Sequence, residues 1–293
     1  MRRAAFPARL LWLACAGMVL AGCSFTRLAY DNVTVLYGNA APMLTWMVDD
    51  YVDISGDQKD WVRERFALAL AWHRRQELPE YRRFLERVAA RFEGNFTAEE
   101  VSDSYRELRA HYHRAAEHLL PDVADFLLQL DGEQVAQLER RFEDDNRKVA
   151  KEATRRSIEE RGRERAAKLC AHFEEWTGAL DARQRERVAA SVRTFADLAP
   201  ERLADRRYRQ SAVLELLRAR AGKERMVAQL RRLLIDTDGW RQPEYQERLR
   251  GREAQMFDLI ASLSATLAPA QREHLVRRLR GFIRDIGTLT AST

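Results

Sequence analysis

Glycine and proline are scarce in this sequence, with 13 and 7 residues respectively in a chain of 293. Because average usage is roughly 7% and 5%, we expect few turns and long helices. Apolar residues recur at spacings of three and four, as in Leu275, Leu279, Phe282 and Ile286, which is typical of amphipathic helices. The alternating segment at residues 33–37 has no evident partner strand. The sequence therefore predicts an all-α fold, an elongated bundle of long helices and helical hairpins with no sheet.

The chain also lacks an N-terminal apolar run long enough to span a membrane. Residues 1–9 carry three arginines and no acid, and the apolar run at residues 10–20 leads into small residues. A membrane-spanning helix needs about 20 apolar residues, whereas a basic start followed by a short apolar run is the layout of a secretory signal. We therefore expect residues 1–22 to be removed as a signal peptide, and residues 23–293 to form one helical domain with a short N-terminal tether.

The signal ends in Leu20-Ala21-Gly22-Cys23, which resembles the lipobox of bacterial lipoproteins. The resemblance implies cleavage between Gly22 and Cys23, a diacylglycerol on the Cys23 sulfur and a third acyl chain on its amine. Each buried methylene contributes about 0.8 kcal/mol, so several chains on one residue should hold the protein firmly at a membrane. Serine rather than aspartate at position 24 favours the periplasmic face of the outer membrane. The alternative is an ordinary cysteine after a transmembrane anchor or a plain cleavage site.

Cysteine is rare, with three residues in the whole chain. Cys15 leaves with the signal and Cys23 carries lipid, so Cys170 alone remains and no internal disulfide is expected. His172 lies two positions further along, on a different face of a helix, and does not activate the thiol. We expect Cys170 to be a buried or half-buried structural residue, with a reactive thiol or an intermolecular disulfide as the alternatives.

Lysine is scarce as well, and arginine supplies 45 of the 50 basic residues. Without the three signal arginines the mature chain has 47 basic and 45 acidic residues, a net charge of +2. The two signs are interleaved, whereas a nucleic-acid-binding protein would carry a basic stripe. Phosphate-binding glycine loops and the GxSxG nucleophile motif are absent. We therefore predict no nucleic-acid partner, cofactor, small-molecule substrate or catalytic residue.

Five short phrases have the form of a helix start. In a capping box, a short polar side chain accepts a hydrogen bond from the third helical amide, and a glutamine or glutamate at that position bonds back to the first amide. A proline at the first helical position serves the same purpose in the last phrase. The predicted capping residues are Ser55 with Gln58, Thr97 with Glu100, Asp131 with Gln134, Asp181 with Gln184, and Gln271 after Ala268 and Pro269.

These starts and the breaks between them predict helices over 26–37, 42–53, 57–76, 79–93, 97–119, 121–129, 131–176, 181–197, 200–220, 222–236, 243–265 and 268–286. The helix over 131–176 is unusual, because 18 of the 27 residues from 139 to 165 are charged. Its apolar stripe thins to Phe142, Val149 and Ile158. It is interpreted either as a solvated, coiled-coil-like arm or as a helix whose stripe meets a partner, with Gly162 as a candidate bend.

Two clusters of ionisable residues are candidates for chemistry. His111, His113 and His118 lie on one predicted helix with Glu107 and Glu117, but the HExxH motif and paired cysteines are missing, so no metal site is predicted. An acidic cluster near Trp46, Tyr51 and Trp61 resembles the carboxylates of a glycan-cleaving site, and equally the acids that favour a helix N-terminus. Its members are Asp49, Asp50, Asp53, Asp57 and Asp60.

The repeated phrases Leu-Asp-x-x-Gln at 130–134 and 180–184 and Leu-Ala-Pro-Ala-Gln at 267–271 resemble the LTxxQ motif of Spy-type periplasmic chaperones. These are small helical proteins that cradle unfolded clients on a concave face. Aspartate or alanine stands here at the threonine position, and this chain is much longer. Over nearly its full length, including residues 30–32, Trp46, Asp57-Gln58 and Trp61, the sequence resembles a proteobacterial family of predicted lipoproteins, which implies a helical lipoprotein and no particular activity.

These patterns together predict a membrane-anchored periplasmic lipoprotein without enzymatic activity, which binds a protein partner or client in a chaperone-like role. The alternative hypothesis is an enzyme that acts on cell-wall peptidoglycan through the Asp49–Asp60 cluster.

Overall fold

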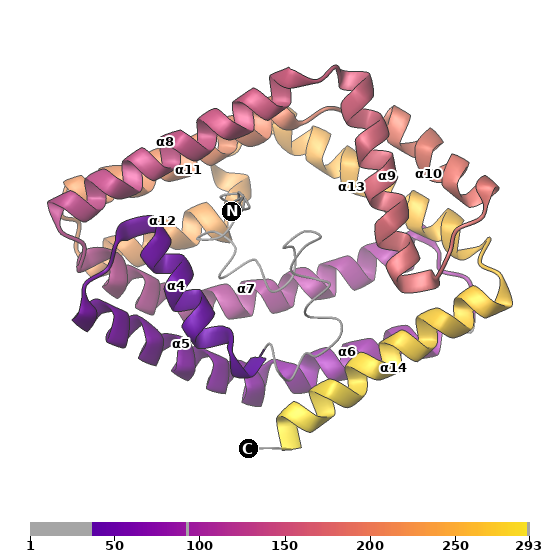
Figure 1. Cartoon of the computed structure of the whole chain (residues 1–293), viewed down its shortest axis with the longest axis horizontal. Coiled ribbons are helices and arrows are strands. Elements are labelled where there is room, and N and C mark those ends of the chain that lie inside the picture. Colours follow the sequence, from indigo (N-terminus) through magenta and orange to yellow (C-terminus); the bar gives the residue numbers. More distant parts are fainter. Residues whose placement is uncertain (1–36, 92–93, 292–293) are drawn as a thin grey trace, which may run out of the picture. The chain divides into compact units, whose positions relative to one another are not determined.

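The computed structural model describes residues 37–91 and 94–291 (Figure 1). Within these ranges the chain forms eleven α-helices and one short 3-10 helix, and it contains no strand. The all-α prediction is therefore confirmed. None of the helices in the described ranges combines the length and apolarity that a membrane crossing needs. Gly22, Cys23 and nearly all of the helix predicted over 26–37 lie outside the described residues.

Most helices begin and end within a few residues of their predicted limits. They are α4 (Ala40–Val52), α5 (Gly56–Gln76), α6 (Leu78–Arg91), α7 (Ala98–Leu128), α8 (Gly132–Arg155), α9 (Ile158–Thr177), α10 (Ala182–Thr194), α11 (Ala199–Arg218), α12 (Lys223–Leu234), η1 (Thr237–Gly239), α13 (Pro243–Ser264) and α14 (Pro269–Ala291).

The described chain divides into two compact units. Unit 1 contains the described residues up to His73 together with His111–Glu152 and Glu201–Arg241. Unit 2 contains Arg74–Ala110, Ala153–Pro200 and the described residues from Gln242 onward. The prediction of a single domain stays a prediction.

Unit 1 has one continuous hydrophobic core. Val52 of α4, Leu120 of α7, Leu138 of α8 and Met226 and Leu233 of α12 are its most deeply buried large side chains. Burying such a side chain contributes about 1.5–3 kcal/mol relative to leaving it exposed. Helices from three separate stretches of chain are therefore held together by apolar burial.

Unit 2 is built from helix pairs. α6 packs along α14, α9 packs against both α10 and α14, and α10 contacts α13. Val188 and Leu259 lie at the centre of one apolar cluster. Leu275 and Leu279 of α14 form a second cluster with the half-buried Trp176. The apolar residues that recur at spacings of three and four in the C-terminal sequence thus face a hydrophobic core.

α7 runs from Ala98 to Leu128 with Pro121 inside it, so the prediction of two helices ending and starting around residue 120 was wrong. Proline removes one backbone hydrogen bond and usually breaks a helix. Here Ala116, Leu120 and Ala124 are almost fully buried on both sides of the proline. Burial of this face outweighs the missing bond and keeps the helix continuous.

The single helix predicted over 131–176 is also wrong, because α8 ends at Arg155 and α9 begins at Ile158. Ser157 accepts a hydrogen bond from the Glu160 amide, and Glu160 accepts one from the Ser157 amide. This is a further capping box, which was not predicted from the sequence, and it has the same form as the four at Ser55, Thr97, Asp131 and Asp181. Gly162 lies inside α9 and makes no bend.

Replacing Pro121 by alanine should stabilise the protein. The side chain is exposed, and alanine removes the cost of proline inside a helix, which is about 3 kcal/mol for the missing hydrogen bond and the ring clash together. The greater freedom of the unfolded alanine chain takes back up to about 1 kcal/mol. Urea unfolding should therefore show a gain of about 2 kcal/mol. Arg109→Ala, at an exposed position of the same helix, serves as control and should change stability by less than about 0.5 kcal/mol. A lower free energy of unfolding for Pro121→Ala would mean that α7 requires the proline.

Candidate functional site

The hydrogen bonds of the predicted helix starts are present in the structure. The Ser55 amide donates to Gln58 Oε1 at 2.9 Å, and the Gln58 amide donates to Ser55 Oγ at 3.3 Å. Thr97 with Glu100, Asp131 with Gln134 and Asp181 with Gln184 form the same reciprocal pairs. Ala268 has no side-chain acceptor, and only its amide bonds to Gln271 Oε1, at 3.0 Å.

In unit 1, two of these glutamines also bond to each other. Gln58 Nε2 donates to Gln134 Oε1 at 3.1 Å, and Gln134 Nε2 donates to Gln58 Oε1 at 2.7 Å. Gln58 Nε2 further donates to the Gln129 carbonyl, and Gln134 Nε2 to the Asp53 carbonyl, both at 3.3 Å. We call this arrangement a glutamine clasp, and it joins the starts of α5 and α8.

A second glutamine clasp joins the starts of α10 and α14 in unit 2. Gln184 and Gln271 exchange amide hydrogen bonds of 2.9 and 3.0 Å. Gln184 Nε2 also donates to the Thr266 carbonyl at 3.0 Å, and Gln271 Nε2 to the Ala179 carbonyl at 2.7 Å. In both clasps each glutamine reaches the carbonyl two residues before its partner's capping residue, so the two units contain the same local structure.

Glutamine is the residue that this geometry requires. Its side-chain oxygen accepts two hydrogen bonds and its amide nitrogen donates two. In a clasp the oxygen accepts from its own helix start and from the partner amide, and both donors are used. Glu100 has no donor in its ionised form, so the capping box that it forms with Thr97 cannot join a clasp. The sequence predicted the helix starts, but nothing in it indicated that they pair.

An open depression of about 470 Å³ lies beside the clasp of unit 1. Its lining is mostly polar and includes the side chains of Asp53, Asp131, Glu133 and Arg140. An apolar ligand would gain little by burial there, because ligand pockets are usually lined by hydrophobic side chains.

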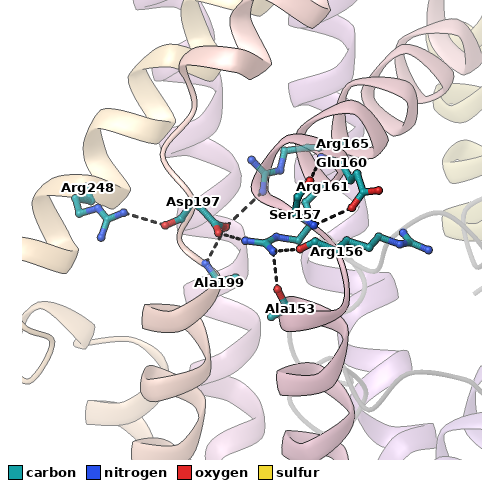
Figure 2. Close-up of polar contacts among 9 residues, drawn as sticks. All are labelled: Ala153, Arg156, Ser157, Glu160, Arg161, Arg165, Asp197, Ala199 and Arg248. Atoms are coloured by element: carbon teal, nitrogen blue, oxygen red, sulfur yellow. Dashed lines mark hydrogen bonds and ion pairs between the residues drawn. The ribbon is translucent and has the colours of Figure 1, made fainter.

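Arg161 forms a polar knot in unit 2 (Figure 2). Its Nη1 donates to the Ala153 carbonyl at 2.5 Å and to the Arg156 carbonyl at 2.6 Å, so it caps the end of α8. Its Nη2 pairs with the carboxylate of Asp197. Arg248 Nη2 donates to the Asp197 carbonyl at 2.9 Å. The break between α8 and α9 is therefore held by Arg161 of α9, which pairs in turn with Asp197 from the segment between α10 and α11.

The pKa of Asp197 is lowered from its ordinary value. Burial alone would raise it, but the hydrogen bonds from Arg161 and from the Ala199 amide, together with the charges of Arg161 and Arg165, favour the ionised form more strongly. Arg165 lies 3.7 Å from this carboxylate. The knot thus contains a carboxylate that is held ionised by neighbouring arginines.

Unit 1 contains a buried polar network that the sequence analysis missed. The Tyr51 hydroxyl donates to Asp145 Oδ2 at 3.0 Å, and Arg206 lies 3.8 Å from the same oxygen. Burial and the neighbouring carboxylate raise the pKa of Tyr51 above its ordinary value. At the next residue of α8, Asn146 Nδ2 donates to Gln210 Oε1 at 2.7 Å. The α8 stripe therefore meets a partner helix, α11, over this part of the charged segment.

The acidic residues between positions 49 and 60 have separate partners. Asp49 pairs with Lys59 at 3.1 Å and accepts a hydrogen bond from the Ile54 amide. Asp50 pairs with Arg141, and Asp60 with Arg63. Asp53 caps the end of α4 in the left-handed conformation, and Asp57 lies in the first turn of α5. The contacts are those expected of helix ends.

The histidines of α7 have separate surroundings. His118 stacks on Trp72 at 3.8 Å between ring centroids, and burial lowers its pKa although Asp122 opposes the shift. His111 is buried beside Arg114, and the ring of His113 lies next to Tyr112. Among the described residues, no group of three or more potential protein ligands could hold a metal ion.

Cys170 is a free, buried cysteine in the core of unit 2. Burial raises the pKa of its thiol, against the lowering effect of Arg185. Because the thiolate is the reactive form, this environment keeps the thiol inert, which agrees with the structural role expected from sequence.

Comparisons with known proteins give one match. The model of a family of unknown function (DUF6279) matches residues 50–246, which are 197 of the 293 residues. This stretch includes the clasp of unit 1, the Asp145 network and all of the Arg161 knot except Arg248. No curated protein and no solved structure matches the chain significantly.

Breaking a clasp should cost more than breaking a capping box. Gln134→Ala removes about four hydrogen bonds, at roughly 1 kcal/mol each, and should lower the free energy of unfolding by about 2–4 kcal/mol. Glu100→Ala, in the capping box outside a clasp, should lower it by about 1 kcal/mol. The double variant Gln58→Ala/Gln134→Ala should lose less than the sum of the single variants. Urea unfolding measures all of these, and strictly additive losses would contradict the clasp.

Asp197→Asn should lower the free energy of unfolding by an amount that depends on pH. A carboxyl whose pKa is lowered by folding stabilises the folded state above its unfolded pKa of about 3.9, and this contribution is lost as the pH falls through the folded value. The stability difference between wild type and Asp197→Asn should therefore be largest at about pH 7 and shrink below about pH 4. Glu186→Gln, in an exposed ion pair with Arg193, is the control and should show little difference throughout.

Proposed function

The chain belongs to DUF6279, a family of unknown function, and we propose that it is a lipoprotein of the bacterial cell envelope that binds another protein. In this proposal the signal peptide is removed before Cys23, and acyl chains on Cys23 hold the protein at the periplasmic face of the outer membrane. The protein acts as a chaperone-like binding protein, without a cofactor or a catalytic residue.

The observation that carries the proposal is the glutamine clasp. It occurs in both units, and three of its four helix starts, those with Gln134, Gln184 and Gln271, have sequences that resemble the LTxxQ motif of periplasmic chaperones. The clasp joins two helix starts in each unit, so its residues have a structural role. We infer that the helical framework serves to present a binding surface. The likeness of the motif supports a role in binding proteins.

Exposed apolar side chains supply points of contact for a partner. Ile158 at the start of α9 is 70% exposed, and Leu68 in unit 1 is 51% exposed. Large apolar side chains in contact with water gain free energy when a partner covers them. Ile158 follows directly on the break fixed by the Arg161 knot, so its position relative to that knot is well defined.

The cell-wall enzyme hypothesis gains no comparable support. Glycosidases keep one carboxyl protonated beside a second carboxylate. Asp49, Asp50 and Asp60 each pair with a basic side chain instead.

The binding proposal is tested with the protein from residue 24 onward, prepared without lipid. At equimolar amounts it should delay the light scattering of a reporter enzyme that is diluted from urea. A photoreactive residue in place of Ile158 should crosslink to the client, whereas one in place of Glu159, an exposed neighbour in unit 2, should do so much less. If scattering is unchanged and neither position crosslinks, the proposal fails.

Anchoring is tested with Cys23→Ala. This variant should lose incorporation of a labelled fatty acid and move from the membrane to the soluble fraction, because the acyl chains supply the membrane affinity. Cys170→Ala keeps the anchor and should remain in the membrane fraction with its label. Continued membrane attachment of Cys23→Ala would contradict lipid anchoring.

A further inference from the structure

The first described helix has an unusual composition. Residues 32–48 contain no aspartate, glutamate, lysine or arginine, in a chain of which 32% is charged. α4 begins within this stretch, at Ala40, and is the most apolar of the described helices. An uncharged segment of this length calls for a physical explanation that the rest of the surface does not need.

The hydrophobic core of unit 1 accounts for only one face of α4. Val48, Tyr51 and Val52 are buried in that core. Trp46 points away and is 63% exposed, with Pro42 exposed one turn earlier on the same side. Residues at i and i+4 share a helix face, so Pro42 and Trp46 form an apolar patch that faces the solvent, with Asp50 one turn further along on the same side.

The charges nearest to Trp46 are compensated. Asp49 and Asp50 lie three and four positions after it and pair with Lys59 and Arg141 respectively. Covering the Trp46 face therefore requires no desolvation of an unpaired carboxylate, which would be costly.

The place of α4 in the chain indicates what covers this face. Residues 24–36 separate Cys23 from Tyr37, the first described residue, and these 13 residues span at most about 47 Å when fully extended. With lipid on Cys23, α4 is therefore tethered within reach of the bilayer surface. Tryptophan is the side chain that concentrates at the membrane–water interface, where one end of the ring is apolar and the other is hydrated.

We propose that the outer face of α4, centred on Trp46, lies in the interfacial region of the phospholipid bilayer and forms a second membrane contact beside the lipid anchor. This inference rests on the proposed lipid anchor. Because residues 32–48 carry no charge, the contact depends on apolar burial. It is therefore insensitive to salt and to the proportion of anionic lipid, unlike contacts made by basic segments.

The test uses the complete lipoprotein reconstituted in vesicles of phosphatidylethanolamine and phosphatidylglycerol. In a Cys170→Ala background, Trp46→Cys provides one free thiol for an environment-sensitive fluorophore, since the Cys23 sulfur carries lipid. Leu68→Cys is the matched control, because Leu68 is also an exposed apolar residue of unit 1. The label at position 46 should shift to shorter wavelengths and be quenched by lipids brominated near the headgroup, at low and high salt alike, whereas the label at 68 should remain aqueous.

The outcomes separate this inference from the proposed anchor. Protein that floats with the vesicles while the label at 46 stays aqueous would overturn the α4 contact and leave the anchor intact. Protein that does not float would overturn both. A shift that high salt abolishes would also contradict the inference, since charges would then carry the contact.

A measurement in cells distinguishes lipid from protein as the occupant. A photoreactive residue at position 46 of the complete lipoprotein should yield adducts with the mass of a phospholipid, and the same residue at position 68 should not. Adducts with a protein at position 46 would overturn the inference in favour of a protein partner.

Discussion

Four glutamine side chains determine how the helix starts of this protein meet. A buried amide group is costly unless all its hydrogen bonds are made, and the clasps satisfy both donors and both acceptor positions of each glutamine. α5 can begin where it does only if α8 begins beside it, and the same holds for α10 and α14. Apolar burial gives most of the stability, but the clasps specify which helix ends are neighbours.

The charged residues have a different part in the structure. Their two signs nearly balance in the mature chain. Many of the ion pairs join exposed partners on one helix and are worth little individually. Carboxylates that are buried or half-buried contribute more to the fold. Asp145 joins α4, α8 and α11 through Tyr51 and Arg206, and Asp197 holds the start of α9 through Arg161. A surface of paired charges suits a protein whose specific contacts are made by a few apolar side chains.

Local features of the fold could be predicted from the sequence, and tertiary ones could not. Most helix ends could be predicted from the capping residues and from the few glycines and prolines that end helices, because these signals act within one turn. Ser157 with Glu160 has the same form and could have been found. Pro121 could not be placed inside α7 from local rules, since burial of Leu120 and its neighbours decides the matter. The pairing of Gln58 with Gln134 bridges 76 positions, and no local pattern indicates which two helix starts will meet.

The second clasp has a consequence for where this protein can be cut. The stretch matched by the family model ends at residue 246, which includes Gln184 but leaves out Gln271. A fragment that stops there would retain one half of the clasp, with a buried amide deprived of its acceptor. It would also lose α14, whose Leu275 and Leu279 complete an apolar cluster. The smallest self-contained piece of the chain therefore extends well beyond the region by which its family is recognised.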